Sequence, residues 1–240
     1  MRYEGKLVMD ARKRQLALAL WNVGAVMDRG RSPESKGFRL KLHETNPDAP
    51  LSPIYLHLRV PENKGGPLTP EIVALAAKLM FAELTAARIN FNALAGIPEA
   101  GNPFAEAMHR LCHSSVRLFE LVKSQVGDQR QIVGIKGDVV SITGYSSPVF
   151  GKWSVLVDDL ITAGHSKEEA IRVVENRGSA VVAIVVLVDR EQGGLEELRK
   201  DGRRKVISVF TITELLDFYL AEGLMPLDIC DEINAYLATA

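Results

Sequence analysis

VLVDDLITAGHS, residues 155–166, is the stretch of this sequence that decides the fold. Its first half is an apolar strand that ends in two acids, Asp158 and Asp159. Their side chains should point to different sides, because side chains alternate along a strand. The second half is a turn of small residues in which Gly164 permits a tight backbone path. Residues 165–178 then have the spacing of an amphipathic helix, so the pattern predicts a strand, a turn and a helix in succession.

The turn between this strand and this helix has the chemistry of a phosphate site. Backbone N–H groups of a turn and of a helix N-terminus bind anions, and Thr162 and Ser166 add two hydroxyl groups. The acids before the turn suit ribose hydroxyls or a magnesium ion. Ligands of open α/β sheets bind at the carboxyl ends of strands, where this turn is placed. The alternative is an ordinary strand–turn–helix in which both acids are caps.

Strands and helices alternate from residue 70 onward. The pattern predicts helices over 70–87, 102–115, 165–178, 194–202, 211–223 and 226–240. It predicts strands over 90–98, 116–123, 153–160, 180–189 and 205–211, a polar loop over 124–131, and short extended pieces over 132–138 and 139–148. Such alternation indicates an α/β fold, a mostly parallel sheet with helices on both faces. The apolar run 180–189 suits a strand covered on both faces, and 205–211 is expected at the sheet edge.

The first 66 residues predict a smaller unit. A helix is expected over 8–27, a polar loop over 28–37, and strands over 38–42 and 52–60 that pair as a hairpin. We therefore expect an N-terminal hood over 1–66 and an α/β core with C-terminal helices over 67–240. A chain of 240 residues suits one structural domain overall.

Composition excludes several classes of protein. The 29 basic and 30 acidic residues leave a net charge of −1, which argues against a nucleic-acid partner. Cys112 and Cys230 lack a metal-ligand spacing and are expected to be reduced. The N-terminus has no apolar signal-peptide region, and no apolar run is long enough to span a bilayer. We therefore expect a cytoplasmic protein with no membrane partner.

The stretch 155–166 resembles the phosphoribosyl pyrophosphate motif of type I phosphoribosyltransferases, in which two acids close the strand and a Thr/Gly-rich loop holds the 5-phosphate. The resemblance implies that Asp158 and Asp159 contact the ribose hydroxyls. The implied phosphate loop consists of Thr162, Ala163, Gly164, His165 and Ser166. His165 replaces the small residue usual in the family, but its backbone N–H is unaffected.

Four more segments are similar to orotate phosphoribosyltransferases, so the resemblance runs from about residue 15 to residue 220. They are LWNVGAVMDRG (20–30), FRLKL with SPIYLHLR (38–42 and 52–59), GIPEAGNPFA (96–105) and LVDREQGG (187–194). The resemblance implies that Lys41 contacts ligand phosphates and that Tyr55 and Thr162 lie near the base. It also implies that Arg190 pairs with the orotate carboxylate. A planar guanidinium can hold a carboxylate by two parallel hydrogen bonds.

Three of these side chains, those of Lys41, Tyr55 and Arg190, also have simpler interpretations. Lys41 could be a solvated strand lysine and Tyr55 a core aromatic residue. Arg190 could form a salt bridge within its own loop, to Asp189 or Glu191.

One segment departs from the orotate enzymes. Their mobile loop carries a basic run similar to RKExKxHG, which reaches across a dimer interface to the pyrophosphate. This chain has VRLFELVKSQVGDQR at 116–130, without the Arg-Lys pair and the histidine. Stabilising the leaving pyrophosphate is an electrostatic task. Lys123 and Arg117 are therefore the candidate catalytic cations, beside the acids Asp158 and Asp159.

The resemblance implies a transferase that moves ribose 5-phosphate from phosphoribosyl pyrophosphate to orotate, a step of pyrimidine nucleotide biosynthesis. It also implies Mg²⁺ bound mainly through the substrate, with no protein metal site, and a homodimer. Two alternatives stay open: a ligand-binding or regulatory protein with weak or lost catalysis, and transfer to another base, because 43–51 lengthens the hood. His109 and His113 are spaced to share a metal, but no glutamate completes an HEXXH pattern.

Overall fold

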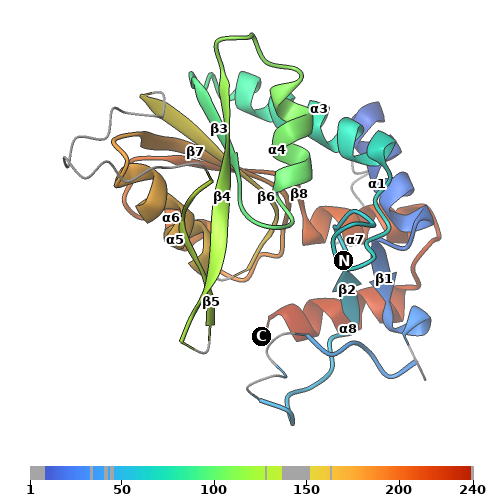
Figure 1. Cartoon of the computed structure of the whole chain (residues 1–240). Helices are drawn as coiled ribbons and strands as arrows, with labels where there is room; N and C mark the ends of the chain where they lie inside the picture. The colour runs from blue at the N-terminus through green and yellow to red at the C-terminus, as the bar shows by residue number, and fades with distance from the viewer. Residues whose placement is uncertain are drawn as a thin grey trace.

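A computed structural model shows a six-stranded sheet at the centre of the chain (Figure 1). The structure describes residues 9–32, 35–40, 43, 46–127, 129–136, 152–162 and 164–238. The strands are β3 (Ala93–Gly96), β4 (Arg117–Val126), β5 (Gln129–Ile135), β6 (Trp153–Ile161), β7 (Ala180–Asp189) and β8 (Lys205–Thr211). Their order is β5-β4-β3-β6-β7-β8, and only the β4–β5 pair is antiparallel. The predicted α/β class with a mostly parallel sheet is confirmed, as is β8 at an edge.

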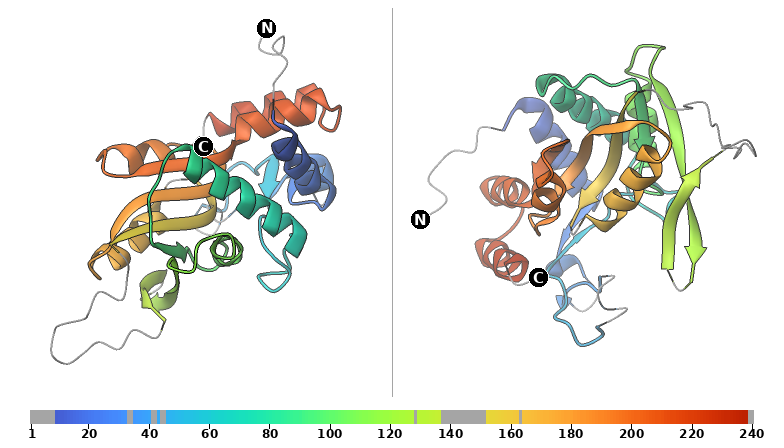
Figure 2. Two further views of the ribbon diagram at one scale, coloured as in Figure 1. Left: turned by 90° about the horizontal axis from the view of Figure 1, so that it is seen from above. Right: turned by 90° about the vertical axis from the view of Figure 1, so that its left-hand side faces the viewer.

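Helices cover both faces of this sheet (Figure 2). Helices α3 (Pro70–Ala86), α4 (Asn102–His109) and α7 (Ile212–Ala221) lie on one face, and α5 (His165–Glu175) and α6 (Gly194–Arg199) lie on the other. The buried strand β7 divides its side chains between the two cores, because neighbouring residues of a strand face opposite ways. Val185 belongs to the first core, and Ile184 and Val186 belong to the second.

The N-terminal hood contains α1 (Ala11–Asn22), β1 (Val26–Asp28), the short 3-10 helix η1 (Arg29–Arg31) and β2 (Ile54–Leu56). The predicted hairpin of 38–42 with 52–60 is found only in part: β2 pairs with β1, and residues 41 and 42 lie outside the described residues. Phe38 and Ser52 form only an isolated bridge. The apolar spacing of α1 continues into β1, which hid the strand, but Gly24 adopts φ 74 and turns the chain there.

The hood and the sheet share one core. Leu16 of α1 and Ile54 of β2 lie in the same buried cluster as Val155 of β6. The Tyr219 hydroxyl on α7 donates a hydrogen bond of 3.0 Å to the Ala17 carbonyl oxygen. Helix α8 (Leu227–Leu237) follows α7 and lies beside the hood (Figure 1). The boundary between residues 66 and 67 stays a prediction.

Two further sequence predictions are wrong. Within the predicted loop 124–131, residues 124–126 end β4 and residues 129–131 begin β5, and Gly127 adopts φ 58. Polar residues occupy this sheet edge because it faces solvent. The predicted helix 102–115 ends early, at His109. The His109 Nε2 lies 2.9 Å from the carbonyl oxygen of Val116, the residue just before β4. The extended piece predicted over 139–148 lies outside the described residues.

No helix within the described part of the chain is long and apolar enough to cross a membrane.

Candidate functional site

The turn between β6 and α5 stands at the carboxyl end of the sheet. Gly164 precedes α5 with φ +83, and no side chain caps the helix among the described residues. The N–H groups of the first helical turn, at His165 and Ser166, have no helical acceptor and are suited to bind an anion. Thr162 lies beside them, and Ala163 lies outside the described residues. The local geometry therefore supports the predicted phosphate turn.

The first residue of α6, Gly194, packs directly on this turn. A Cβ atom added at Gly194 would lie 2.0 Å from the Thr162 carbonyl oxygen and 3.0 Å from the Gly164 nitrogen. Only a residue without a side chain permits such an approach. The turn after β6 and the start of α6, which follows β7, therefore form one surface at the carboxyl end of the sheet.

The two acids at the end of β6 lie in different surroundings, as predicted from strand alternation. Asp158 is buried, and its Oδ1 accepts a hydrogen bond of 2.9 Å from the Asp159 backbone N–H. Asp159 is half-buried. Burial raises the pKa of Asp159 well above its ordinary value, and the negative charge of Asp158 raises it further, while Lys167 and Arg59 oppose the shift.

Lys167 is the site residue that the sequence did not indicate. Its ammonium group lies 2.7 Å from Asp158 Oδ2, and both side chains are almost fully buried. It also donates a hydrogen bond of 2.5 Å to the Leu160 carbonyl oxygen. A lysine in the first turn of an amphipathic helix ordinarily lies in solvent, so no sequence signal distinguished it.

Arg190, which follows β7, has a buried side chain without an anionic partner in the described structure. Its Nε and Nη2 atoms make no hydrogen bond with the described residues. No salt bridge joins Arg190 to Asp189 or Glu191 in the described structure. Asp189 accepts a hydrogen bond from the Glu191 N–H, and Glu191 accepts one from the Thr213 N–H. Burial lowers the pKa of Arg190, partly offset by Tyr236. A buried cation without a partner is costly, so an anionic ligand group would stabilise it.

Arg190 also lies close to the phosphate turn. Its backbone N–H donates a hydrogen bond of 3.1 Å to the carbonyl oxygen of Ile161, the residue just before that turn. Residues 68–221 match the family described as "Phosphoribosyl transferase domain". The chain belongs to this family.

Several proteins of known type resemble this phosphoribosyl transferase. An orotate phosphoribosyltransferase of Sulfurisphaera tokodaii is 30% identical over 149 residues, which cover 62% of this chain and 69% of that protein. The structure of Leishmania donovani UMP synthase has a TM-score of 0.67 and 26% identity, covering 95% of this chain and 42% of that one. The orotate phosphoribosyltransferase structure from Aeropyrum pernix, with TM-score 0.60, 24% identity and coverage of 88% and 99%, supports the fold.

The phosphoribosyl transferase sheet separates the two candidate cations of β4. Arg117 is level with Ala93 and Ser154, at the amino ends of the strands, so the structure does not bring it to the phosphate turn. Lys123 lies three residues beyond Glu120, which is level with Gly96 near the carboxyl end. Of the two, only Lys123 lies at the end of the sheet that holds the turn.

The hood contributes an aromatic group and a cation. The half-buried ring of Tyr55 stacks on Phe38 at a centroid distance of 5.4 Å and contacts the His57 ring at 5.7 Å. Arg59 is close enough to Asp159 to influence its charge. Lys41 lies outside the described residues, so its predicted phosphate contact stays a prediction, as does the contact of Tyr55 with the base.

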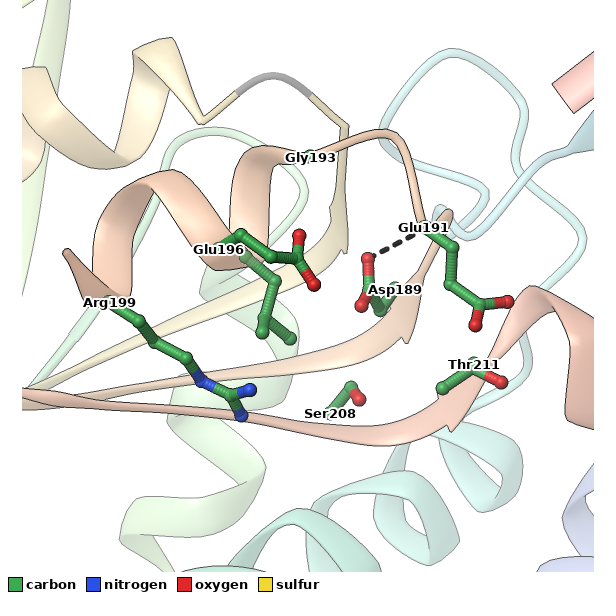
Figure 3. A pocket seen from close by; sticks show the side chains of 8 residues that line it. Asp189, Glu191, Gly193, Glu196, Arg199, Ser208 and Thr211 are labelled. Carbon is green, nitrogen blue, oxygen red and sulfur yellow. Dashed lines mark hydrogen bonds between the residues drawn. The ribbon is translucent and has the colours of Figure 1, made fainter. Parts of the chain in front are cut away.

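A pocket of about 540 Å³ lies at the ends of β7 and β8 (Figure 3). Its lining includes the carboxylates of Asp189, Glu191 and Glu196, with Arg199 at one side. Burial raises the pKa of Asp189, and the two nearby glutamates add to the effect. Because carboxylates repel anions, this pocket does not suit a phosphate or an orotate carboxylate. The predicted phosphate turn remains the candidate site.

The histidine pair does not form a metal site. His109 ends α4, and His113 lies beyond it, where its Nδ1 is 3.1 Å from the Ser115 hydroxyl. The described residues contain no group of three or more side chains arranged to hold a metal ion.

The raised pKa of Asp159 predicts a pH-dependent stability. The folded protein holds this proton more tightly than the unfolded chain, whose pKa is near 3.8. The free energy of unfolding should therefore fall as pH rises from that value through the folded-state pKa. Asp159→Asn should remove this fall and stabilise the ligand-free protein at neutral pH. Urea unfolding over a pH series checks both, and parallel profiles for the two proteins would contradict the prediction.

Proposed function

We propose that this phosphoribosyl transferase is a glycosyltransferase that transfers ribose 5-phosphate from phosphoribosyl pyrophosphate to orotate. The products are orotidine 5′-phosphate and pyrophosphate. The observation that carries the choice of acceptor is the buried guanidinium of Arg190, which has no anionic partner among the described residues. The backbone N–H of Arg190 is hydrogen-bonded to Ile161, just before the phosphate turn. The named relatives support the same activity. A carboxylate is the ligand group that a planar guanidinium fits best.

The reaction exchanges one bond at the anomeric carbon of ribose. The bond to the pyrophosphate oxygen breaks, and that oxygen keeps the electron pair. A pyrimidine nitrogen forms the new bond and releases its proton to the leaving pyrophosphate or to solvent. Positive charge develops on the sugar ring between these events. In this proposal the N–H groups at the start of α5 bind the 5-phosphate, and Asp158 and Asp159 face the ribose. Arg190 holds the carboxylate of orotate, so that the reacting nitrogen is oriented toward the anomeric carbon.

Magnesium fits this site as an ion carried by the substrate. Asp159 is a half-buried carboxylate whose negative charge is disfavoured by its surroundings, so a cation nearby would stabilise its ionised form. In this proposal the pyrophosphate supplies most of the ligands of the ion. When bound, the ion supplies neutralisation of the pyrophosphate charge.

An assay with orotate, phosphoribosyl pyrophosphate and magnesium tests the proposal, with orotate absorbance as the readout. We expect consumption of orotate that depends on the pyrophosphate donor. Donor binding without turnover would favour the alternative of a ligand-binding or regulatory protein with weak or lost catalysis, which the missing basic residues at 116–130 suggested. Turnover with uracil or hypoxanthine but not orotate would assign a different base. A cytoplasmic location, a homodimer and the catalytic role of Lys123 stay predictions.

A further inference from the structure

Lys167 is a buried cation in the first turn of α5. The exposed fraction of its side chain is 6%, equal to that of Asp158, its partner at 2.7 Å. Burying an ammonium group is unfavourable unless it is paired and hydrogen-bonded. The contact therefore differs from surface ion pairs, which contribute little to stability.

The same ammonium group connects the two sides of the phosphate turn. It reaches back from α5 to the Leu160 carbonyl oxygen at 2.5 Å, and the Ser166 hydroxyl is at the limit of hydrogen bonding, 3.5 Å away. Leu160 precedes the turn and Lys167 follows it, so these bonds fix the separation of strand and helix. The direction of the α5 N–H groups depends on that separation.

These contacts also give the two acids different roles. One carboxylate oxygen of Asp158 pairs with the Lys167 ammonium group, and the other accepts a hydrogen bond from the Asp159 N–H. Both oxygens therefore already have partners within the protein. Asp159 is the more exposed of the two. A ligand at the carboxyl end of β6 can therefore contact Asp159 without breaking a buried ion pair.

We infer that Lys167 is a positioning residue: it holds Asp158 and the phosphate turn in the geometry that binds the phosphoribosyl group, and it leaves Asp159 as the more accessible of the two acids that face the ribose. The inference rests on the proposed function, because it concerns the same donor site. It adds Lys167 to that site and gives the two acids different roles, with Asp158 paired to Lys167 and Asp159 accessible to the ligand.

Lys167→Met tests this role by titration calorimetry with phosphoribosyl pyrophosphate and magnesium. We expect the donor Kd to rise by roughly 10- to 100-fold, about 1.4 kcal/mol per factor of ten. The KM for orotate should change by less than about threefold, because the substitution does not alter the residues proposed to bind the base. If Lys167→Met does not fold, Lys167→Gln, which keeps an N–H donor for Leu160, is measured in the same way.

A double-mutant cycle separates positioning through Asp158 from a direct effect of the lysine charge. If Lys167 acts through Asp158, the variant Lys167→Met/Asp158→Asn should lose no more donor affinity than Lys167→Met alone. Additive losses would mean that the two residues act independently, which contradicts the inference.

Arg204→Met is the matched control at the other end of α5. Arg204 has a side chain 7% exposed and pairs with Glu175 at 3.1 Å and Asp201 at 2.7 Å. Its replacement should lower the melting temperature but leave the donor Kd unchanged. Equal donor affinity in wild type and Lys167→Met would overturn the inference alone. A wild-type protein that binds no donor would overturn the proposed function and the inference with it.

Discussion

Replacing Arg190 with methionine should lower kcat/KM for orotate by roughly 10²- to 10³-fold, because removing one partner of a buried charge pair costs about 2–5 kcal/mol. The guanidinium is buried, and its Nε and Nη2 atoms have no partner among the described residues. The orotate carboxylate would supply that partner. Steady-state assays with orotate varied at saturating donor measure the loss.

Three further measurements distinguish loss of the orotate contact from a general defect of the Arg190→Met variant. The donor Kd should be unchanged in Arg190→Met, since the phosphate turn is intact. The melting temperature of the ligand-free variant should rise, because an unpaired buried charge is removed. Arg203→Met, which removes a side chain 71% exposed, should leave all of these quantities at wild-type values. An unchanged kcat/KM in Arg190→Met would show that Arg190 does not hold the carboxylate.

Gly194→Ala should abolish tight donor binding and destabilise the fold. The added methyl group would lie 2.0 Å from the Thr162 carbonyl oxygen, so the start of α6 and the phosphate turn must move apart. Overpacking of this kind costs about 1–3 kcal/mol, and more against rigid backbone. We expect a donor Kd at least about 100-fold weaker, because the turn N–H groups lose their alignment. Calorimetry and urea unfolding measure the two effects.

Gly193→Ala is the control for Gly194→Ala. Gly193 adopts φ +84, but a Cβ atom there would have no neighbour within 4 Å. The substitution should therefore cost only the backbone strain of a left-handed residue, about 1–2 kcal/mol, and leave the donor Kd close to wild type. If the two variants weaken donor binding equally, contact with Thr162 is not the reason for the glycine at 194.

The errors in the sequence prediction fall mainly in the hood and at the sheet edge. Residues 26–28 continue the apolar spacing of the preceding helix, yet they pair with Ile54–Leu56. Residues 124–126 and 129–131 are mostly polar, yet they pair with each other as the ends of β4 and β5. In both cases, pairing with a distant or exposed partner strand overrode the local pattern.

The sequence by itself determined the strand–turn–helix at 155–166, the apolar strand β7 and the α/β class, because local spacing and burial on both faces leave direct marks on composition. Only the tertiary structure decided that Lys167 is buried against Asp158 and that the Nε and Nη2 atoms of Arg190 have no hydrogen-bond partner within the described residues. It also showed that Gly194 touches the phosphate turn. The physical reason is that the charge and accessibility of a side chain depend on neighbours brought together by folding, which residue spacing along the chain does not specify.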